Sequence, residues 1–187
     1  MKRMLCGTLL LVGVVACGSK SPTQPSPTPT PTPKVPSVTF TSTAGAIAGT
    51  TLSLVPASLS NDREGTVSFS VRIDNALGVS KVRGDLLFDG ALLEYDGWAH
   101  GGFLEQSDAV VDWTWIDNYG RLSLFLDRAT QAGGASGNGT IIAFRLKPRA
   151  GVTSGSTQIQ WNDPVLYNVG FRPLIINRQY GGTVTIQ

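Results

Sequence analysis

The chain has 187 residues, of which 41% are hydrophobic, and 15 Lys and Arg against 13 Asp and Glu give a formal net charge of +2. This length allows one domain of ordinary size with additional segments. No basic run or mixture of basic and aromatic residues indicates nucleic-acid binding. The two cysteines, Cys6 and Cys17, both lie near the start, which excludes a disulfide framework or cysteine-based metal site in the rest of the chain.

The first 16 residues have the order of a bacterial export signal. Met1, Lys2 and Arg3 are followed by an apolar run at residues 9–15, which is too short to remain in a bilayer as a span. Residues 14–17, VVAC, resemble the lipobox of bacterial lipoproteins. The resemblance implies a signal peptide over residues 1–16, cleavage before Cys17 and a lipid on its thiol. We therefore expect a lipid-anchored protein of the bacterial cell envelope, at the outer membrane or the cell surface.

A linker rich in Pro and Thr is predicted next, over residues 17–36. It holds seven of the eleven prolines. Proline lacks a backbone donor, so this segment cannot join a sheet. We expect an extended spacer that holds the folded domain roughly 50 to 60 Å from the lipid, at about 3.1 Å per residue. The folded domain is then expected over residues 37–187.

Alternating segments predict strands throughout this domain. Short strands are expected at residues 38–41 and 51–54, separated by the small-residue stretch 44–49. The clearest alternation lies at residues 66–74, where we expect the apolar set to face inward and the polar set to face solvent. The inward set is Val67, Phe69, Val71 and Ile73, and the outward set is Ser68, Ser70 and Arg72.

The next strand, which begins at residue 79, has the same alternation. Val82, Gly84, Leu86 and Phe88 point one way, and Arg83, Asp85 and Leu87 point the other. Asp89-Gly90 predicts a tight turn, after which residues 91–95 are expected to return against this strand. A second turn is expected at Asp96-Gly97.

The remaining chain predicts further strands and no helix. They are expected at residues 109–117, 121–127, 140–146, 157–161, 165–168, 174–177 and 182–186, with a Gly-rich loop at 133–139. Many short strands separated by Gly, Asp and Asn turns predict an all-β protein with a β-sandwich fold.

Residues 88–104, FDGALLEYDGWAHGGFL, resemble a characteristic stretch of cohesin domains. Phe88-Asp89, Leu93-Glu94-Tyr95 and Gly102-Phe103-Leu104 match the pattern, whereas Gly90 stands where the family usually has Pro. The similarity extends over about residues 51–187. It implies a jelly-roll β-sandwich of about nine strands.

The resemblance also implies a function. Cohesins are non-catalytic receptors that bind dockerin modules, which are small calcium-binding helical domains on polysaccharide-degrading enzymes. They do so with one face of the jelly roll, which varies between members, so no recognition residue is carried over to this sequence.

The residues themselves argue against an enzyme. His100 is the single histidine, it lies in a Gly-rich stretch, and no serine near it has a nucleophile motif. Asp85, Glu94 and Asp112 show no spacing that indicates a catalytic carboxylate pair. We expect no cofactor. The alternative is a structural calcium ion held by turn residues. Such residues more commonly serve to form hydrogen bonds within their own turns. These residues are Asp89, Asp96, Asp117, Asn118, Asn162 and Asp163.

Several aromatic and apolar residues point to a binding face. Trp113 and Trp115 share one side of a predicted strand and are either core residues or an exposed platform. Leu87 and Phe125 interrupt the polar sides of their strands, so they either form an exposed patch or are covered by residues 44–49. The candidate face comprises Arg83, Asp85, Leu87, Trp113, Trp115, Ser123 and Phe125.

Two functions stay open from these residues. The first is a receptor for a protein partner such as a dockerin-like module, bound by apolar anchors within a polar rim. The second is direct polysaccharide binding, by stacking of sugar rings on the tryptophans. In both, the membrane is contacted only through the lipid on Cys17.

The lipobox resemblance gives a direct prediction. The change Cys17→Ser removes the thiol that would carry the lipid, so the protein should leave the membrane fraction. Fractionation after a salt wash measures this, and a variant that stays with the membranes would contradict anchoring through Cys17.

Overall fold

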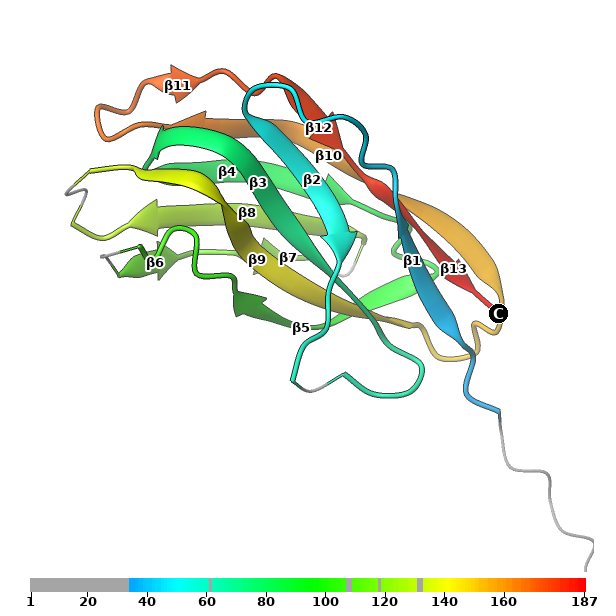
Figure 1. Ribbon diagram of the computed structural model, residues 1–187. Coiled ribbons are helices and arrows are strands. Elements are labelled where there is room, and N and C mark those ends of the chain that lie inside the picture. Colours follow the sequence, from blue (N-terminus) through cyan, green and yellow to red (C-terminus); the bar gives the residue numbers. More distant parts are fainter. Residues whose placement is uncertain (1–33, 61, 107–108, 118, 131–132) are drawn as a thin grey trace, which may run out of the picture. The chain divides into compact units, whose positions relative to one another are not determined.

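The protein is all-β in the computed structural model, which describes residues 34–60, 62–106, 109–117, 119–130 and 133–187. These residues form 13 strands in two sheets that face each other (Figure 1). The expected β-sandwich is confirmed, although the strands are more numerous than the nine or so implied by the resemblance. Within the described ranges there is no helix with the length and apolar character needed to cross a membrane. The predicted signal peptide, Cys17 and linker residues 17–33 lie outside them.

The first sheet has eight strands and carries the candidate face. Its order is β1-β13-β10-β4-β8-β6, with β11 paired to β10 and β7 paired to β8, and all its pairs are antiparallel. The bounds are β1 Val38–Ser42, β13 Gly182–Ile186, β10 Gly155–Tyr167, β4 Lys81–Leu87, β8 Arg121–Arg128, β6 Val110–Asp112, β7 Trp115–Ile116 and β11 Pro173–Leu174.

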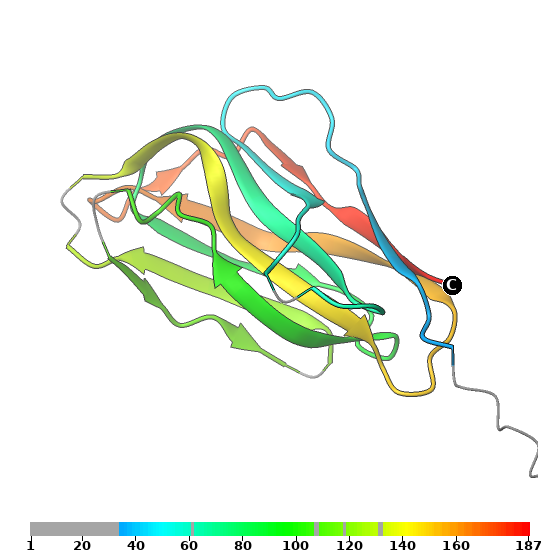
Figure 2. The same cartoon turned by 60° about the horizontal axis from the view of Figure 1, so that its bottom comes forward.

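The second sheet has five strands in the order β12-β2-β3-β9-β5, in which only the β12–β2 pair is parallel. The bounds are β12 Arg178–Tyr180, β2 Thr51–Pro56, β3 Val67–Val79, β9 Ala135–Pro148 and β5 Leu93–His100. The long strands β3 and β9 lie side by side in the two views and form the centre of this layer (Figures 1 and 2).

The core lies between the sheets and follows the predicted alternation. The buried residues include Val67, Phe69, Val71 and Ile73 of β3, Val82 and Leu86 of β4, and Leu122, Leu124 and Leu126 of β8. At its centre the ring of Phe69 lies 5.3 Å from that of Phe40 and 5.9 Å from that of Phe144. These contacts join β1, β3 and β9, so the core links both sheets.

The predicted return of residues 91–95 is wrong. The backbone N–H groups of Leu92 and Leu93 both donate to the carbonyl of Asp89, and this turn leads the chain into the other sheet, where β5 pairs with β9. The expected second turn at Asp96-Gly97 is also wrong. Strand β5 continues through both residues with a register shift, because Arg145 of β9 donates hydrogen bonds to the carboxylate and the carbonyl of Asp96.

Two other strand predictions need correction. Residues 109–117 form two short strands, β6 and β7, because the chain turns at Thr114, whose N–H donates to Asp112 at 2.6 Å. Residues 157–161 and 165–168 belong largely to a single strand, β10, which has a register shift between Asn162 and Val165.

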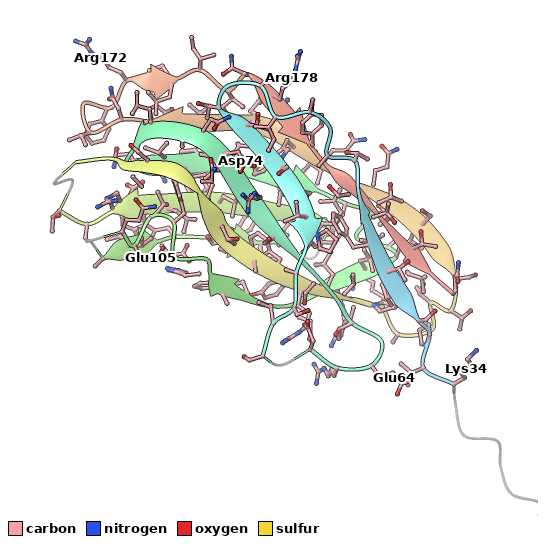
Figure 3. The ribbon with its side chains drawn as sticks, in the orientation of Figure 1. Lys34, Glu64, Asp74, Glu105, Arg172 and Arg178 are labelled. Atoms are coloured by element: carbon pink, nitrogen blue, oxygen red, sulfur yellow. The ribbon has the colours of Figure 1, made fainter. Side chains whose placement is uncertain are left out.

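The outer face of the second sheet is more covered than the sequence predicted. Ser68 and Ser70 were expected to face solvent but are buried, as is Asp74. Exposed charged side chains such as Glu64, Arg172 and Arg178 extend away from the sheets, whereas Asp74, a residue of β3, stays close to its sheet (Figure 3). The cover over Ser68 is the loop before β3, since its hydroxyl donates to Asp62 at 2.5 Å.

The aromatic contacts of Phe69 predict a large effect of its removal. Phe69→Ala leaves a cavity between the rings of Phe40 and Phe144, so the free energy of unfolding should fall by about 3 to 5 kcal/mol. Denaturant unfolding measures this. The control is Leu77→Ala, also on β3 but with 78% of its surface exposed, which should change stability by less than about 0.5 kcal/mol. Equal losses in the two variants would contradict the assigned core.

Candidate functional site

The outward side chains of β10, β4, β8 and β7 form regular rows across the first sheet. Asp85 of β4 is paired with Ser123 of β8 and Asn162 of β10, and Ser123 is paired in turn with Trp115 of β7. The neighbouring row pairs Arg83 with Phe125, whose carbonyl accepts the N–H of Trp113 at 2.9 Å. We call this surface the open face. It consists of Arg83, Asp85, Leu87, Trp113, Trp115, Arg121, Ser123, Phe125 and Asn162.

The open face contains all seven residues of the predicted binding face. Trp113 is 60% exposed and Trp115 is 58% exposed, so the interpretation of this pair as core residues is wrong. Leu87 and Phe125 are also exposed, at 40% and 38%. The tertiary structure therefore brings together four large apolar side chains that solvent reaches.

Residues 44–49 do not cover this patch. The carbonyl of Ala46 in this loop accepts a hydrogen bond from the hydroxyl of Tyr180, and Thr50 donates to Asn177. These contacts hold the loop beside β2 and β12 of the second sheet, where it lines a hollow with Arg72 and Asp74. The alternative explanation for exposed Leu87 and Phe125 is therefore wrong.

Asp85 holds the centre of the open face in one arrangement. Its carboxylate accepts hydrogen bonds from Arg121 and Ser123, both at 2.7 Å, and from Asn162 at 3.3 Å. Burial disfavours its charged form, but the hydrogen bonds from Arg121, Ser123 and Asn162 outweigh burial and hold the pKa of Asp85 below its ordinary value. Asp85 is therefore a fixed anion that ties three strands together.

A second ion-pair group lies beside the aromatic residues. Asp127 accepts from buried Lys81 at 2.7 Å and from Arg83 at 3.1 Å. The guanidinium of Arg83 lies 4.8 Å from the centre of the Phe125 ring, and the Lys81 ammonium lies 4.3 Å from that of Phe171. Cations over ring faces stabilise both groups, so Phe125 is held in place by Arg83.

His100 is bound by two carboxylates rather than lying free in a loop. It ends β5, with Nδ1 2.6 Å from Glu105 and Nε2 3.2 Å from Asp112, and its ring stacks on Trp98 at 4.9 Å. These contacts join β5 to β6 at an edge of the sandwich, near Glu105 in Figure 3. Each ring nitrogen has a carboxylate partner, so His100 has a structural role at this edge.

Four of the six turn residues considered for calcium have other partners. Asp89 accepts from Ala91, Asp117 accepts from Tyr119 and Arg121, and Asp96 pairs with Arg63 and Arg145. Asn162 donates to Asp85 on the open face, Asp163 lies at the β10 register shift, and Asn118 lies outside the described residues. Among the residues that the structure describes, no three His, Cys, Asp or Glu side chains are grouped so as to hold a metal ion.

The three carboxylates considered for catalysis each have a different partner. Asp85 pairs with Arg121, Glu94 with Lys147, and Asp112 with His100. They lie on β4, β5 and β6, so the fold distributes them over both sheets.

The sequence missed two members of the open face. Arg121 has the same parity as Ser123 and Phe125, so alternation alone could have included it. Asn162 could not be found in this way, because its place depends on the pairing of β10 with β4, strands that are far apart in the sequence.

The lowered pKa of Asp85 predicts a pH-dependent effect. A carboxylate whose pKa is lower in the folded state stabilises the fold above its unfolded pKa of about 4, and the stabilisation is lost as pH falls through the folded pKa. Asp85→Asn should therefore lower the free energy of unfolding by about 1 to 2 kcal/mol at neutral pH. The difference in unfolding free energy between this variant and the parent should shrink as pH falls below about 4.

Denaturant unfolding across this pH range measures the difference. The matched control is Asp163→Asn, which changes an exposed carboxylate of β10. Its free energy of unfolding should equal that of the parent at each pH. A deficit in Asp85→Asn that persists undiminished in acid would contradict the assigned role.

No protein-family model matches the sequence, and no curated protein matches it. Solved structures do. A non-cellulosomal cohesin from the hyperthermophilic archaeon Archaeoglobus fulgidus is 16% identical with a TM-score of 0.53, and the match covers 72% of this chain and 89% of that one.

Two further solved structures also match this chain. A type II cohesin domain from the cellulosome of Acetivibrio cellulolyticus is 15% identical with a TM-score of 0.56, covering 72% of this chain and 93% of its own. A type I cohesin–dockerin complex from Clostridium thermocellum is 13% identical with a TM-score of 0.51, covering 63% and 81%. The chain therefore has a cohesin-like fold.

Proposed function

We propose that this chain is a non-catalytic binding module whose open face receives a protein partner of the dockerin type. The observation that carries the proposal is the group of four exposed apolar side chains, Leu87, Phe125, Trp113 and Trp115, on one sheet face with fixed charges beside them. The Clostridium thermocellum structure, a cohesin bound to a dockerin, supports it by likeness of fold.

The open face has the composition of a protein interface. Apolar and aromatic anchor residues with charged residues around them are typical of such interfaces. Trp and Arg are frequent among the residues that contribute most to affinity. Arg83 and Arg121 are already held by Asp127 and Asp85. Because these side chains are ordered before binding, they would lose less conformational entropy when a partner contacts them.

The anchor to the cell envelope is a separate part of the proposal. It is supported by the lipobox-like residues before Cys17 and by the proline content of residues 17–36. A module held away from a membrane by such a spacer would present its open face to partners outside the cell.

Carbohydrate binding is a second candidate, favoured by the exposure of Trp113 and Trp115. Exposed indole rings can stack on sugar rings. A polysaccharide would need the tryptophans, whereas a protein partner would also need Leu87 and Phe125.

The double change Leu87→Ser with Phe125→Ser tests the protein-partner proposal. Both side chains are part-exposed, so the melting temperature should stay within a few degrees of the parent. Affinity for a dockerin module should fall at least about tenfold, or roughly 1.4 kcal/mol, because the apolar anchors are lost. Calorimetric titration with dockerin modules encoded in the same genome measures the affinity.

The control is Leu77→Ser with Ile175→Ser, two residues that are each 78% exposed and lie outside the open face. This variant should bind as the parent does. If no dockerin module binds the parent, or if the stable Leu87 and Phe125 double variant keeps full affinity, the proposed face is wrong. Loss of polysaccharide binding in Trp113→Ala and Trp115→Ala, with no dockerin binding in the parent, would favour the second candidate.

A further inference from the structure

The open face is smaller than most protein interfaces. Its rows run from Leu87 to Arg83 and cross four strands, which is about 13 Å along β4 and about 14 Å across the sheet. A typical interface takes about 800 Å² from each partner, or a patch roughly 28 Å on a side. A protein partner would therefore contact more of this sheet. Because β7 lies at the edge and β4 ends at Leu87, the surface continues either across β10 or along β4 toward Lys81.

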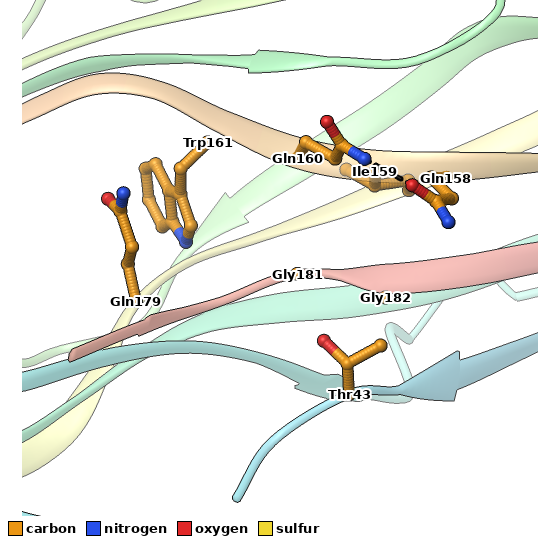
Figure 4. Close-up of a pocket in the computed structure, with 8 residues that line it drawn as sticks. All are labelled: Thr43, Gln158, Ile159, Gln160, Trp161, Gln179, Gly181 and Gly182. Carbon is orange, nitrogen blue, oxygen red and sulfur yellow. Dashed lines mark hydrogen bonds between the residues drawn. The ribbon is translucent and has the colours of Figure 1, made fainter.

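Across β10 the outward side chains are polar and uncharged. Gln160 is paired with Leu87 of β4, and Gln158, two residues earlier, is paired with Thr183 of β13. The side-chain amide of Gln160 donates to that of Gln158 along the strand (Figure 4). These three positions therefore offer no large apolar side chain to a partner.

Along β4 the surface continues to an exposed aromatic ring. Lys81 has the parity of Arg83 and Asp85, so its side chain leaves the same side of the sheet. Only 6% of Lys81 is exposed, since its ammonium is bound to Asp127 at 2.7 Å and lies 4.3 Å from the centre of the Phe171 ring. Phe171 itself is 59% exposed. One side of the ring therefore covers the ammonium, and much of the rest is open to solvent.

A series of contacts joins this ring to the open face. Asp127, which binds Lys81, also accepts a hydrogen bond from Arg83 at 3.1 Å, and the guanidinium of Arg83 lies 4.8 Å from the centre of the Phe125 ring. The series runs from the ring of Phe171 through three charged groups to the ring of Phe125. The surface then follows all seven residues of β4, which is about 20 Å. Phe171 thus brings its length closer to that of an ordinary interface.

The backbone of Phe171 is held in an unusual conformation. Its φ is 57°, in the left-handed region, which is unfavourable for residues with a Cβ and rare for bulky ones. The other non-glycine residues with positive φ in the described ranges are Asn75 and Asp163, whose types tolerate it better. The turn is closed by Asn168, whose N–H donates to the carbonyl of Arg172 and whose carbonyl accepts from the N–H of Phe171, both at 3.0 Å. These bonds and the ammonium contact together define the position of the ring.

Covering the ion pair of Lys81 and Asp127 accounts for one side of the Phe171 ring. It does not account for an aromatic side chain that leaves most of its surface in water at a strained position, since glycine or asparagine would form the same turn with less strain. Aromatic side chains contribute a large contact area to interfaces, and a ring whose position is already defined loses little conformational freedom on binding.

We propose that Phe171 is a further anchor for the protein partner of the open face, and that an apolar side chain of that partner packs on the exposed part of its ring. The inference rests on the proposed function. It extends the binding surface from the sheet to a second element, the turn between β10 and β11.

The test is the change Phe171→Asn. Asparagine tolerates a positive φ, so the turn should keep its conformation while the ring is lost. Affinity for the dockerin module that binds the parent should fall at least about fivefold, or roughly 1 kcal/mol, by calorimetry. The melting temperature should stay within a few degrees of the parent. The matched control is Ile175→Asn, which removes an apolar side chain that is 78% exposed and lies outside this series of contacts, and it should leave the affinity unchanged.

A second measurement separates direct contact from an effect transmitted through Lys81. In a complex of the isotope-labelled parent with the unlabelled dockerin module, the ring protons of Phe171 should show nuclear Overhauser effects to protons of the module. The chain has seven phenylalanines, and the ring signals missing from the spectrum of Phe171→Asn identify those of Phe171.

Three outcomes would overturn the inference. If Phe171→Asn has parental affinity while Leu87→Ser with Phe125→Ser loses it, the partner does not reach the turn and only the proposed function stands. If affinity falls but the ring shows no contact with the module, Phe171 acts only by positioning Lys81 and Arg83. If the parent binds no dockerin module, the proposed function fails and this inference fails with it.

Discussion

The register between β4 and β8 is the constraint on which the candidate site depends. Their antiparallel pairing sets Asp85 opposite Ser123 and Arg83 opposite Phe125, while Leu86 lies opposite Leu122 on the other side. A shift of one residue would move every side chain to the opposite face. Burial of the leucines in the core excludes such a shift, so the same contacts that stabilise the sandwich also fix which residues form the open face.

The open face combines ordered charges with exposed apolar groups. Asp85 and Asp127 each hold an arginine, and the guanidinium of Arg83 lies against Phe125. Hydrogen bonds across β4, β8 and β10 keep the carboxylate of Asp85 ionised despite its burial. Solvent still reaches Leu87 and the tryptophans beside these charges. These contacts hold the charged side chains of the face in one arrangement, which agrees with the receptor role proposed above.

Close backbone approaches shape both edges of β10. Gly84 of β4 has a φ of 143°, and a Cβ there would lie 2.8 Å from the Cα of Pro164, at the register shift of β10. On the other side, Gly181 permits the chain to cross from β12 of the second sheet to β13 of the first, because a Cβ there would overlap the carbonyl of Ile159. Strand β10 pairs with β13 up to Ile159 and with β4 from Gln160 onward, and each glycine permits a close backbone approach beside one of these two parts.

The sequence alone determined the strand alternation, because side chains on a strand must face opposite sides and the apolar set must be buried. This identified the core side of β3, β4 and β8 and the outward position of Leu87 and Phe125. It could not determine which strands are neighbours, since pairing depends on contacts between distant segments. For that reason β5 was assigned to the wrong neighbour, and Asn162 was missing from the predicted face. The exposure of Trp113 and Trp115 was likewise decided by tertiary structure, because β7 lies at the edge of the sheet and the loop that could have covered the face is bound to the opposite sheet.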